Sequence, residues 1–299
     1  MTRSKATAVG FIAVLLWALL ALLTVGSAPT PPLLLNAICF SVGGTLGLIW
    51  TAASGKLGQL RKVSWKIYVF GTVGLFGYHA LYFSALRLAP AAEAGLIAYL
   101  WPLLIVLMSG LLPGETLRRG HLIGAGLGFA GAATIIAGGG TGFQVQYLPG
   151  YGLALLCALA WSGYSVISRL VGSAPTSSVA VFCVATAVAS WGLHFALEDT
   201  VWPVGALGWT STLLLGLGPI GLAFYVWDIG VKQGDIQMLG TSSYSAPLLS
   251  TLVLVLAGIA APSWGLALAA ALITAGAVIA ARSSATTSRR DASNTSGKG

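Results

Sequence analysis

Long apolar stretches alternate with short polar connections along nearly the whole chain. A helix that crosses a bilayer needs about 20 predominantly apolar residues, and ten such stretches follow one another between Ala6 and Ala281. The predicted spans are 6–25, 33–54, 66–86, 91–112, 121–138, 150–171, 177–197, 207–230, 237–258 and 263–281. The pattern therefore predicts an all-α integral membrane protein with ten transmembrane helices.

The first stretch follows Arg3 and Lys5, as the apolar region of a signal peptide would. A removable apolar region is shorter and is followed by a cleavage site of small residues. We therefore interpret residues 6–25 as a retained first helix.

Composition and charge support a membrane protein. Hydrophobic residues make up 57% of the chain and charged residues 7%, and the mean hydropathy of +0.89 excludes a soluble globule. The connections on one side of the ten spans, with the two ends, hold 14 of the 15 lysines and arginines, and the other side holds only Arg87. The net charge of +8 is thus a topology signal and does not indicate a nucleic-acid partner. The positive-inside rule predicts a plasma (cell inner) membrane protein with both termini in the cytoplasm.

The C-terminal segment and the three cysteines do not indicate a functional site. Residues 283–299 are rich in Ser, Thr and basic residues and are expected to be a disordered cytoplasmic tail. Cys39, Cys157 and Cys183 lie inside apolar stretches, so we expect neither a disulfide framework nor a metal site. No cofactor and no obligatory protein partner is predicted.

The sequence repeats itself with a shift of about 144 residues. The matched pairs are Trp17 with Trp161, Trp65 with Trp209, Gly74 with Gly218, Gly77 with Gly221, Tyr99 with Tyr244 and Pro102 with Pro247. We predict a first five-helix repeat over 1–144 and a second over 145–282. Because five is an odd number, the second repeat enters the membrane from the opposite side, and inverted repeats are typical of secondary transporters.

The segments AEAGLIAYLWPLL and LGTSSYSAPLLSTLV, each followed by a Gly-rich terminal helix, resemble the drug/metabolite transporter superfamily. The resemblance is to its ten-helix exporters with two EamA-type repeats and covers about residues 6–282. Within that superfamily the chain is similar to inner-membrane exporters of aromatic amino acids. The resemblance implies alternating access and passage of the substrate through a cavity between the repeats.

Pro102 and Pro247 predict helix breaks inside the fourth and ninth spans. Proline removes a backbone hydrogen bond and leaves the carbonyl groups near Ala98 and Ser243 for other partners. Lipid cannot satisfy these carbonyls, so they must face protein, water or ligand. We expect the two broken helices to form the central pair, although both breaks are also explained as kinks that neighbouring helices tolerate.

Aromatic side chains lie at mid-depth, too far from the span ends for an interfacial belt. Flat apolar faces with a polar edge suit an aromatic or flat organic solute. The predicted substrate-binding residues are Trp17, Tyr78, His79, Tyr82, Tyr99, Trp101, Trp161, Tyr164, Ser165, Tyr225 and Tyr244, and Trp227 lies at a comparable depth. The alternative for each of these residues is ordinary packing between helices.

Ionisable residues inside the spans are few. Glu93 is expected to pair with Arg87 or to cap its helix, and Asp228 and Lys232 are expected to form an ion pair along one helix. His79 lies deepest and is predicted to donate or accept a hydrogen bond with the substrate. Because the sequence places no carboxylate at mid-depth, we predict a facilitative exporter, with proton exchange through His79 as the alternative.

Other function classes fit less well. HExxH is absent, and no histidine follows the serine cluster at 242–245, so we do not predict an enzyme. Phosphate-sugar carriers need cations near the central prolines, where this chain is neutral. The expected partners are therefore membrane lipid and a small neutral or zwitterionic solute, such as an aromatic amino acid. A proton-coupled drug or metabolite exporter that accepts a broader range of organic cations stays open as the alternative.

Overall fold

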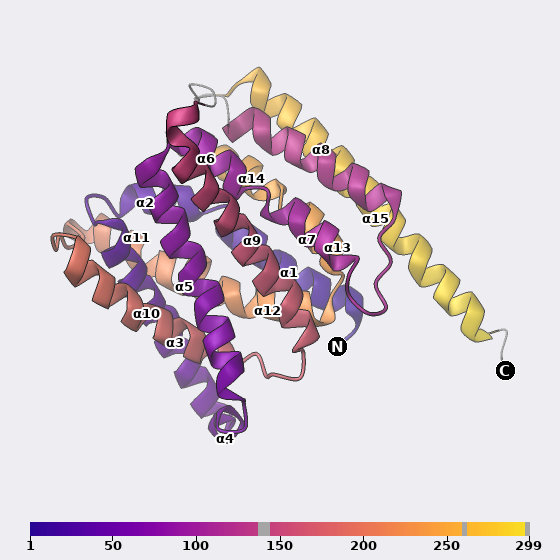
Figure 1. Ribbon diagram of the computed structural model, residues 1–299, viewed down its shortest axis with the longest axis horizontal. Coiled ribbons are helices and arrows are strands. Elements are labelled where there is room, and N and C mark those ends of the chain that lie inside the picture. Colours follow the sequence, from indigo (N-terminus) through magenta and orange to yellow (C-terminus); the bar gives the residue numbers. More distant parts are fainter. Residues whose placement is uncertain (137–143, 259–261, 297–299) are drawn as a thin grey trace.

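The computed structural model describes residues 1–136, 144–258 and 262–296, apart from the side chains of 87, 91, 92, 135 and 284–296. Within these ranges every regular element is a helix (Figure 1). Eight helical segments of the described chain are long and apolar enough to cross a membrane, and Glu93–Ser109 is a shorter apolar segment. The all-α membrane fold is confirmed, whereas the count of ten spans and the division into two repeats stay predictions.

The helices of the first half follow the predicted spans within a few residues. They are α1 (Arg3–Trp17), α2 (Leu20–Gly26), α3 (Pro32–Ala53), α4 (Leu57–Leu60), α5 (Trp65–Leu88), α6 (Ala91–Ala98), α7 (Trp101–Ser109) and α8 (Arg119–Ile136). Residues 137 and 138, at the end of the fifth predicted span, lie outside the described residues. The first predicted span is divided into α1 and α2, and the fourth into α6 and α7.

A 3₁₀ turn, η2 (Val145–Tyr147), opens the second half. The helices that follow are α9 (Leu148–Leu170), α10 (Ser178–Leu197), α11 (Gly205–Leu217), the π-helical turn η3 (Gly218–Leu222), α12 (Ala223–Gln233), α13 (Ile236–Ser242), α14 (Ser245–Leu256) and α15 (Trp264–Ser296). Helix α15 continues into the segment 283–299, which we expected to be disordered. No glycine or proline interrupts the chain between Gly276 and Gly297, so the helix has no local reason to end earlier.

Four helix pairs make the main contacts of the fold. They are α1 with α12, α5 with α9, α3 with α10, and α8 with α15. Figure 1 shows α8 and α15 side by side along one edge of the molecule. Glycines let these helices approach closely: a Cβ atom added to Gly10 of α1 would lie 2.7 Å from the Cα atom of Gly230 in α12.

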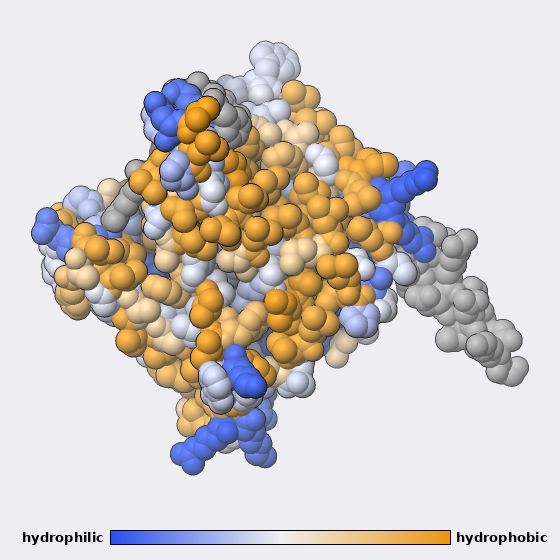
Figure 2. Space-filling model, in the orientation of Figure 1, coloured by the Kyte–Doolittle hydropathy of each residue, from blue (hydrophilic) through white to orange (hydrophobic). Residues whose placement is uncertain are grey.

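The outer surface is largely apolar, as a lipid-facing surface requires (Figure 2). Exposed large hydrophobic side chains include Val73 of α5 and Val188 of α10, which are 62% and 67% exposed. Hydrophilic residues gather at the extremities of the view, including the end where α4 lies. Exposing so much apolar surface to water is energetically unfavourable, so this surface is suited to contact with lipid.

Candidate functional site

The two helix breaks lie face to face and stabilise each other. Helices α6 and α7 are separated at Tyr99–Leu100, and α13 and α14 at Ser243–Tyr244, each break lying shortly before a proline. The Tyr99 hydroxyl donates a hydrogen bond to the Ser243 carbonyl at 3.4 Å. The Tyr244 hydroxyl accepts a hydrogen bond of 2.9 Å from the Leu103 backbone N–H. The break between α13 and α14 leaves the Ser243 carbonyl without a helical partner, and Tyr99 supplies one. The start of α7 leaves the Leu103 N–H without a helical partner, and Tyr244 supplies one.

Four tryptophans form a compact group beside these breaks. They are Trp17 of α1, Trp101 of α7, Trp161 of α9 and Trp227 of α12, and all six pairs of rings have centroids 5.2 to 6.3 Å apart. Most of these pairs are edge-to-face or tilted, which is the favourable geometry for aromatic rings. Two of the tryptophans come from each half of the chain.

Tyrosine and histidine side chains extend this group along α5. The ring centroids of Tyr78 and Trp161 lie 5.4 Å apart, and Tyr82 stacks on Tyr78 with centroids 6.2 Å apart. The His79 ring meets the Tyr78 ring edge-to-face, with centroids 5.1 Å apart. The Nδ1 atom of His79 lies 2.7 Å from the Leu75 carbonyl. Because a carbonyl only accepts, Nδ1 carries a proton, and in the neutral ring the Nε2 lone pair is the acceptor.

Accessibility differs along the set of rings. Trp101, Trp161 and Trp227 are buried, at 5%, 3% and 1% exposure, whereas Tyr78, His79, Tyr82 and Tyr99 keep part of their surface exposed. We call these seven side chains, with Trp17 and Tyr244, the ring set. Along α5, Tyr78 lies 13 residues beyond Trp65, which corresponds to about 20 Å of helix. The partly exposed Tyr78, His79 and Tyr82 therefore lie in the part of α5 that is farther from the basic turn before Trp65.

The structure places the remaining predicted residues differently. Tyr164 is stacked between Trp161 and Phe70 and is 3% exposed, so it supports the ring set from behind. Ser165 is fully buried and accepts a hydrogen bond of 3.1 Å from the indole N–H of Trp227. Tyr225 is not brought to the ring set, because its hydroxyl donates to the Gly43 carbonyl of α3 at 3.0 Å.

Sequence reasoning did not single out the π-helical turn η3. The indole N–H of Trp17 donates to the Pro219 carbonyl in this turn at 3.1 Å, which holds Trp17 against the second half of the chain. The Gly218–Pro219 dipeptide inside the eighth predicted span is a local signal for such an irregularity.

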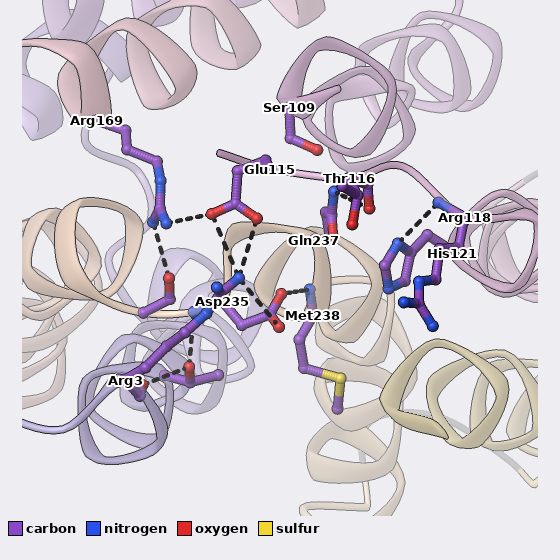
Figure 3. A network of polar contacts seen from close by, with 12 residues as sticks. Arg3, Ser109, Glu115, Thr116, Arg118, His121, Arg169, Asp235, Gln237 and Met238 are labelled. Atoms are coloured by element: carbon purple, nitrogen blue, oxygen red, sulfur yellow. Dashed lines mark hydrogen bonds and ion pairs between the residues drawn. The ribbon is translucent and has the colours of Figure 1, made fainter. Parts of the chain in front are cut away.

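A network of charged side chains joins the start of α1, the α7–α8 connection and the end of α9 (Figure 3). We call the end of the molecule that holds the basic connections the basic end. Arg3 donates to both oxygens of Glu115, at 3.3 and 3.0 Å, and lies 3.5 Å from Asp235. Arg169, at the end of α9, pairs with the same Glu115 carboxylate. Figure 3 shows Glu115 between the two arginines, although the three residues come from distant parts of the chain. Because Glu115 is 5% exposed, the pairing compensates an otherwise buried negative charge.

Backbone contacts reinforce this network. Arg169 donates to the carbonyl groups of Val231 and Gly234 at 3.0 and 2.8 Å, at the end of α12. Asp235 caps α13 by accepting the Met238 N–H at 2.9 Å, and its own N–H donates to Thr7 at 2.8 Å. The start of α1, the end of α9 and the α12–α13 junction are thereby tied together. We call Arg3, Glu115, Arg169 and Asp235 the ionic cluster.

The predicted ion pair of α12 is confirmed. Lys232 lies 2.8 Å from the Asp228 carboxylate, which also accepts a hydrogen bond of 2.8 Å from Thr176. Glu93 lies in the first turn of α6 and is buried, and the side chain of Arg87, one of its two expected partners, lies outside the described residues. In the described part of the chain, no three His, Cys, Asp or Glu side chains lie close enough to hold a metal ion.

Comparison with known proteins now adds to this geometry. The family model for EamA-like transporters matches residues 4–137. A protein of Ancylobacter novellus named aromatic amino acid exporter YddG is 53% identical over 282 residues, covering 94% of this chain and 98% of the relative. The chain belongs to the EamA-like transporter family. It is therefore a membrane transporter, and its resemblance to the drug/metabolite transporter superfamily is confirmed.

Two further similarities extend over most of this EamA-like chain. A protein of Salmonella typhimurium, also named aromatic amino acid exporter YddG, is 28% identical over 265 residues, covering 84% of this chain and 88% of that protein. A solved crystal structure with 53% sequence identity has a TM-score of 0.89 and covers 93% of this chain and 98% of that chain. The similarity therefore includes both halves of the fold.

Proposed function

We propose that this protein exports aromatic amino acids, or similar neutral and zwitterionic solutes with a large flat apolar part. The observation that carries the proposal is the ring set, which both halves of the chain supply and in which several rings keep part of their surface exposed. Stacked and edge-to-face rings offer an aromatic side chain both packing modes that such rings favour. The names of the relatives from Ancylobacter and Salmonella agree with this substrate class.

The arrangement in the membrane follows from charge and packing. We place the protein in the cell inner membrane with both termini in the cytoplasm, because the basic connections gather at the end that holds the ionic cluster. Ten crossings result when the broken pair α6–α7 and the 18-residue α8 are added to the eight apolar spans.

Helix pairing supports inverted repeats. A two-fold relation between the halves exchanges the first predicted span (α1) with the sixth (α9). It also exchanges the third span (α5) with the eighth, which contains α12. Contact of α1 with α12 then becomes contact of α9 with α5, and both pairs are among the main contacts of the fold. The pairs α3–α10 and α8–α15 each join a helix to its own counterpart, as the same relation requires.

This arrangement suits alternating access. The Tyr78, His79 and Tyr82 rings keep part of their surface exposed on the part of α5 away from the basic end. The ionic cluster joins segments of both halves at the basic end, and we infer that it closes this end. Solute from the cytoplasm enters only after the ionic cluster separates, and the described state is then the one that faces outward.

Transport is proposed to be facilitative. Asp228 is paired with Lys232, and Glu115 with Arg3 and Arg169, so these carboxylates are held by cations. His79 is the titratable ring in the ring set, and its Nε2 lone pair suits acceptance of a hydrogen bond from a substrate ammonium group.

Counterflow in liposomes that contain only this protein tests the substrate class. Vesicles loaded with unlabelled phenylalanine are expected to take up labelled phenylalanine, tyrosine and tryptophan, and not organic cations. Exchange of organic cations without exchange of aromatic amino acids overturns the proposal. Facilitative transport is refuted by uphill accumulation under a pH gradient, provided that a protonophore and His79→Ala both abolish it.

A further inference from the structure

A cavity of about 450 Å³ lies at the basic end of the molecule, apart from the ring set. One wall is the turn between α4 and α5, and the other is the turn between α9 and α10. The polar residues of its lining are Gln59, Lys62, Ser64 and Ser173, and its apolar residues include Ile67 and Pro175. Its volume is within the range of about 300–1,000 Å³ that is usual for small-molecule sites.

Positive charge dominates this cavity. Lys62 is the one charged residue of its lining, and no carboxylate lines it. Lys56, Arg61 and Lys66 are exposed before, within and after this turn, and the sequence contains no acidic residue between Lys56 and Lys66. In the described part of the chain no carboxylate pairs with Lys62, so the protein does not compensate its positive charge. The site therefore favours an anion.

The charges behind the opposite wall are already compensated. Lys232 pairs with Asp228 at 2.8 Å and donates to the Ala174 carbonyl at 2.9 Å, directly beside the cavity. Thr176 donates to the same Asp228 carboxylate. Asp228 is therefore held by two partners and does not oppose an anion near Lys62.

Exposed tryptophans place the cavity at the depth of lipid headgroups. Trp65, which follows the lining residue Ser64, is 68% exposed, and Trp50 is 48% exposed. The Nζ atom of Lys56 lies 5.8 Å from the centroid of the Trp50 ring. Indole rings favour the headgroup layer of a bilayer. A basic cavity with both apolar and hydroxyl-bearing walls at this depth fits the phosphate and first carbons of a lipid.

We propose that this cavity binds a phosphate anion, supplied by the headgroup of an anionic phospholipid such as phosphatidylglycerol. The Lys62 ammonium group neutralises the phosphate, and Gln59, Ser64 and Ser173 supply hydrogen-bond donors around it. Ile67 and Pro175 contact the glycerol carbons that lead toward the acyl chains. The site is separate from the ring set, so it does not depend on which solute is transported.

Native mass spectrometry of the purified full chain tests the site. The protein is titrated with phosphatidylglycerol and with phosphatidylcholine of the same acyl chains, and in a separate arm with glycerol 1-phosphate. The variants are Lys62→Gln and, as a matched control, Lys66→Gln, which removes the same charge from the start of α5, outside the lining. Both side chains are exposed, and equal thermal unfolding in phosphatidylcholine checks that both variants fold.

We expect phosphatidylglycerol to be retained preferentially. Lys62→Gln is expected to weaken its binding about tenfold, since a hydrogen bond to a charged group is lost. Lys66→Gln is expected to weaken it about twofold at most, as an exposed charge does. Equal weakening by both variants, or equal retention of the two lipids, overturns the site. Binding of glycerol 1-phosphate as tight as that of the lipid, with the same dependence on Lys62, overturns the lipid as its source.

Discussion

Replacing Glu115 by Gln removes the negative charge that joins the two arginines of the ionic cluster. The Glu115 side chain is 5% exposed, whereas Arg3 is 49% and Arg169 is 19% exposed. Two unit charges 4 Å apart attract by about 4 kcal/mol at an effective dielectric constant of 20. Water around Arg3 reduces that pair to about 1 kcal/mol or less. The more buried Arg169 pair is worth about 1 to 2 kcal/mol, because Gln keeps one hydrogen bond to it.

The closed basic end therefore loses about 1.5 to 3 kcal/mol in this variant, which raises the ratio of open to closed states by about 10- to 150-fold. Ser168 is 3% exposed, lies next to Arg169, and serves as a reporter when it is changed to Cys. The native cysteines Cys39, Cys157 and Cys183 are replaced by Ala in this background.

A membrane-impermeant maleimide, added to the basic end in inside-out vesicles, is expected to label the reporter at least about tenfold faster in Glu115→Gln. Asp199→Asn, which neutralises an exposed carboxylate after α10, is the matched control and should label at the parent rate. Adding Arg169→Gln to Glu115→Gln should change labelling by less than the sum of the single effects, since the two residues share one interaction. A parent labelling rate in Glu115→Gln would show that the ionic cluster does not hold this end closed.

Three further predictions concern the helix breaks, the helix crossing and the topology. Tyr244→Phe should lower thermal stability by about 1 to 3 kcal/mol, because a buried N–H loses its acceptor, and Tyr99→Phe by only about 1 kcal/mol; the reverse order in unfolding assays would contradict this account. Gly10→Ala should lower stability, because the new Cβ atom would lie 2.7 Å from the Gly230 Cα atom. Gly152→Ala, whose new Cβ atom would have no neighbouring atom within 4 Å, should leave stability unchanged or raise it when the two variants are compared in the same unfolding assay. A single cysteine at position 4 should resist impermeant maleimide added to intact cells, and rapid labelling there would contradict a cytoplasmic N-terminus.

Local sequence signals were sufficient for the helices and for two of their breaks. Apolar length located most of the helices within a few residues, because a lipid environment leaves a spanning segment few alternatives to a helix. It did not predict the continuation of α15 to Ser296. The prolines at 102 and 247 indicated the breaks, because a missing N–H and a steric clash are properties of the residue itself. The same reasoning predicted the pair of Asp228 and Lys232, which are neighbours on one helix turn.

Contacts between distant segments could not be predicted in this way. Glu115 lies 112 residues from Arg3 and 54 from Arg169. Arg3 begins α1, Glu115 lies between α7 and α8, and Arg169 lies in the last turn of α9, so no local pattern links them. The depth of a residue in the membrane also does not determine which side of its helix the side chain lies on. Tyr225 and Trp227 are two residues apart on α12, yet Tyr225 turns toward α3 while Trp227 completes the group of tryptophans. The depth of a side chain follows from its position in the apolar stretch, whereas the neighbour that it contacts depends on which helix packs alongside.

The most direct test of the ring set as the substrate site is phenylalanine counterflow into liposomes with equal amounts of parent protein, Trp101→Ala, Tyr78→Ala or Trp209→Ala. Trp101 is buried within the ring set, Tyr78 is a partly exposed member of it, and Trp209 is a 42% exposed indole on α11 that serves as the control. Loss of a ring from the binding surface is expected to raise the half-saturating concentration about tenfold in both ring-set variants and to leave it unchanged in Trp209→Ala. Parent half-saturation in Trp101→Ala and Tyr78→Ala would contradict the account, and so would an equal rise in all three variants.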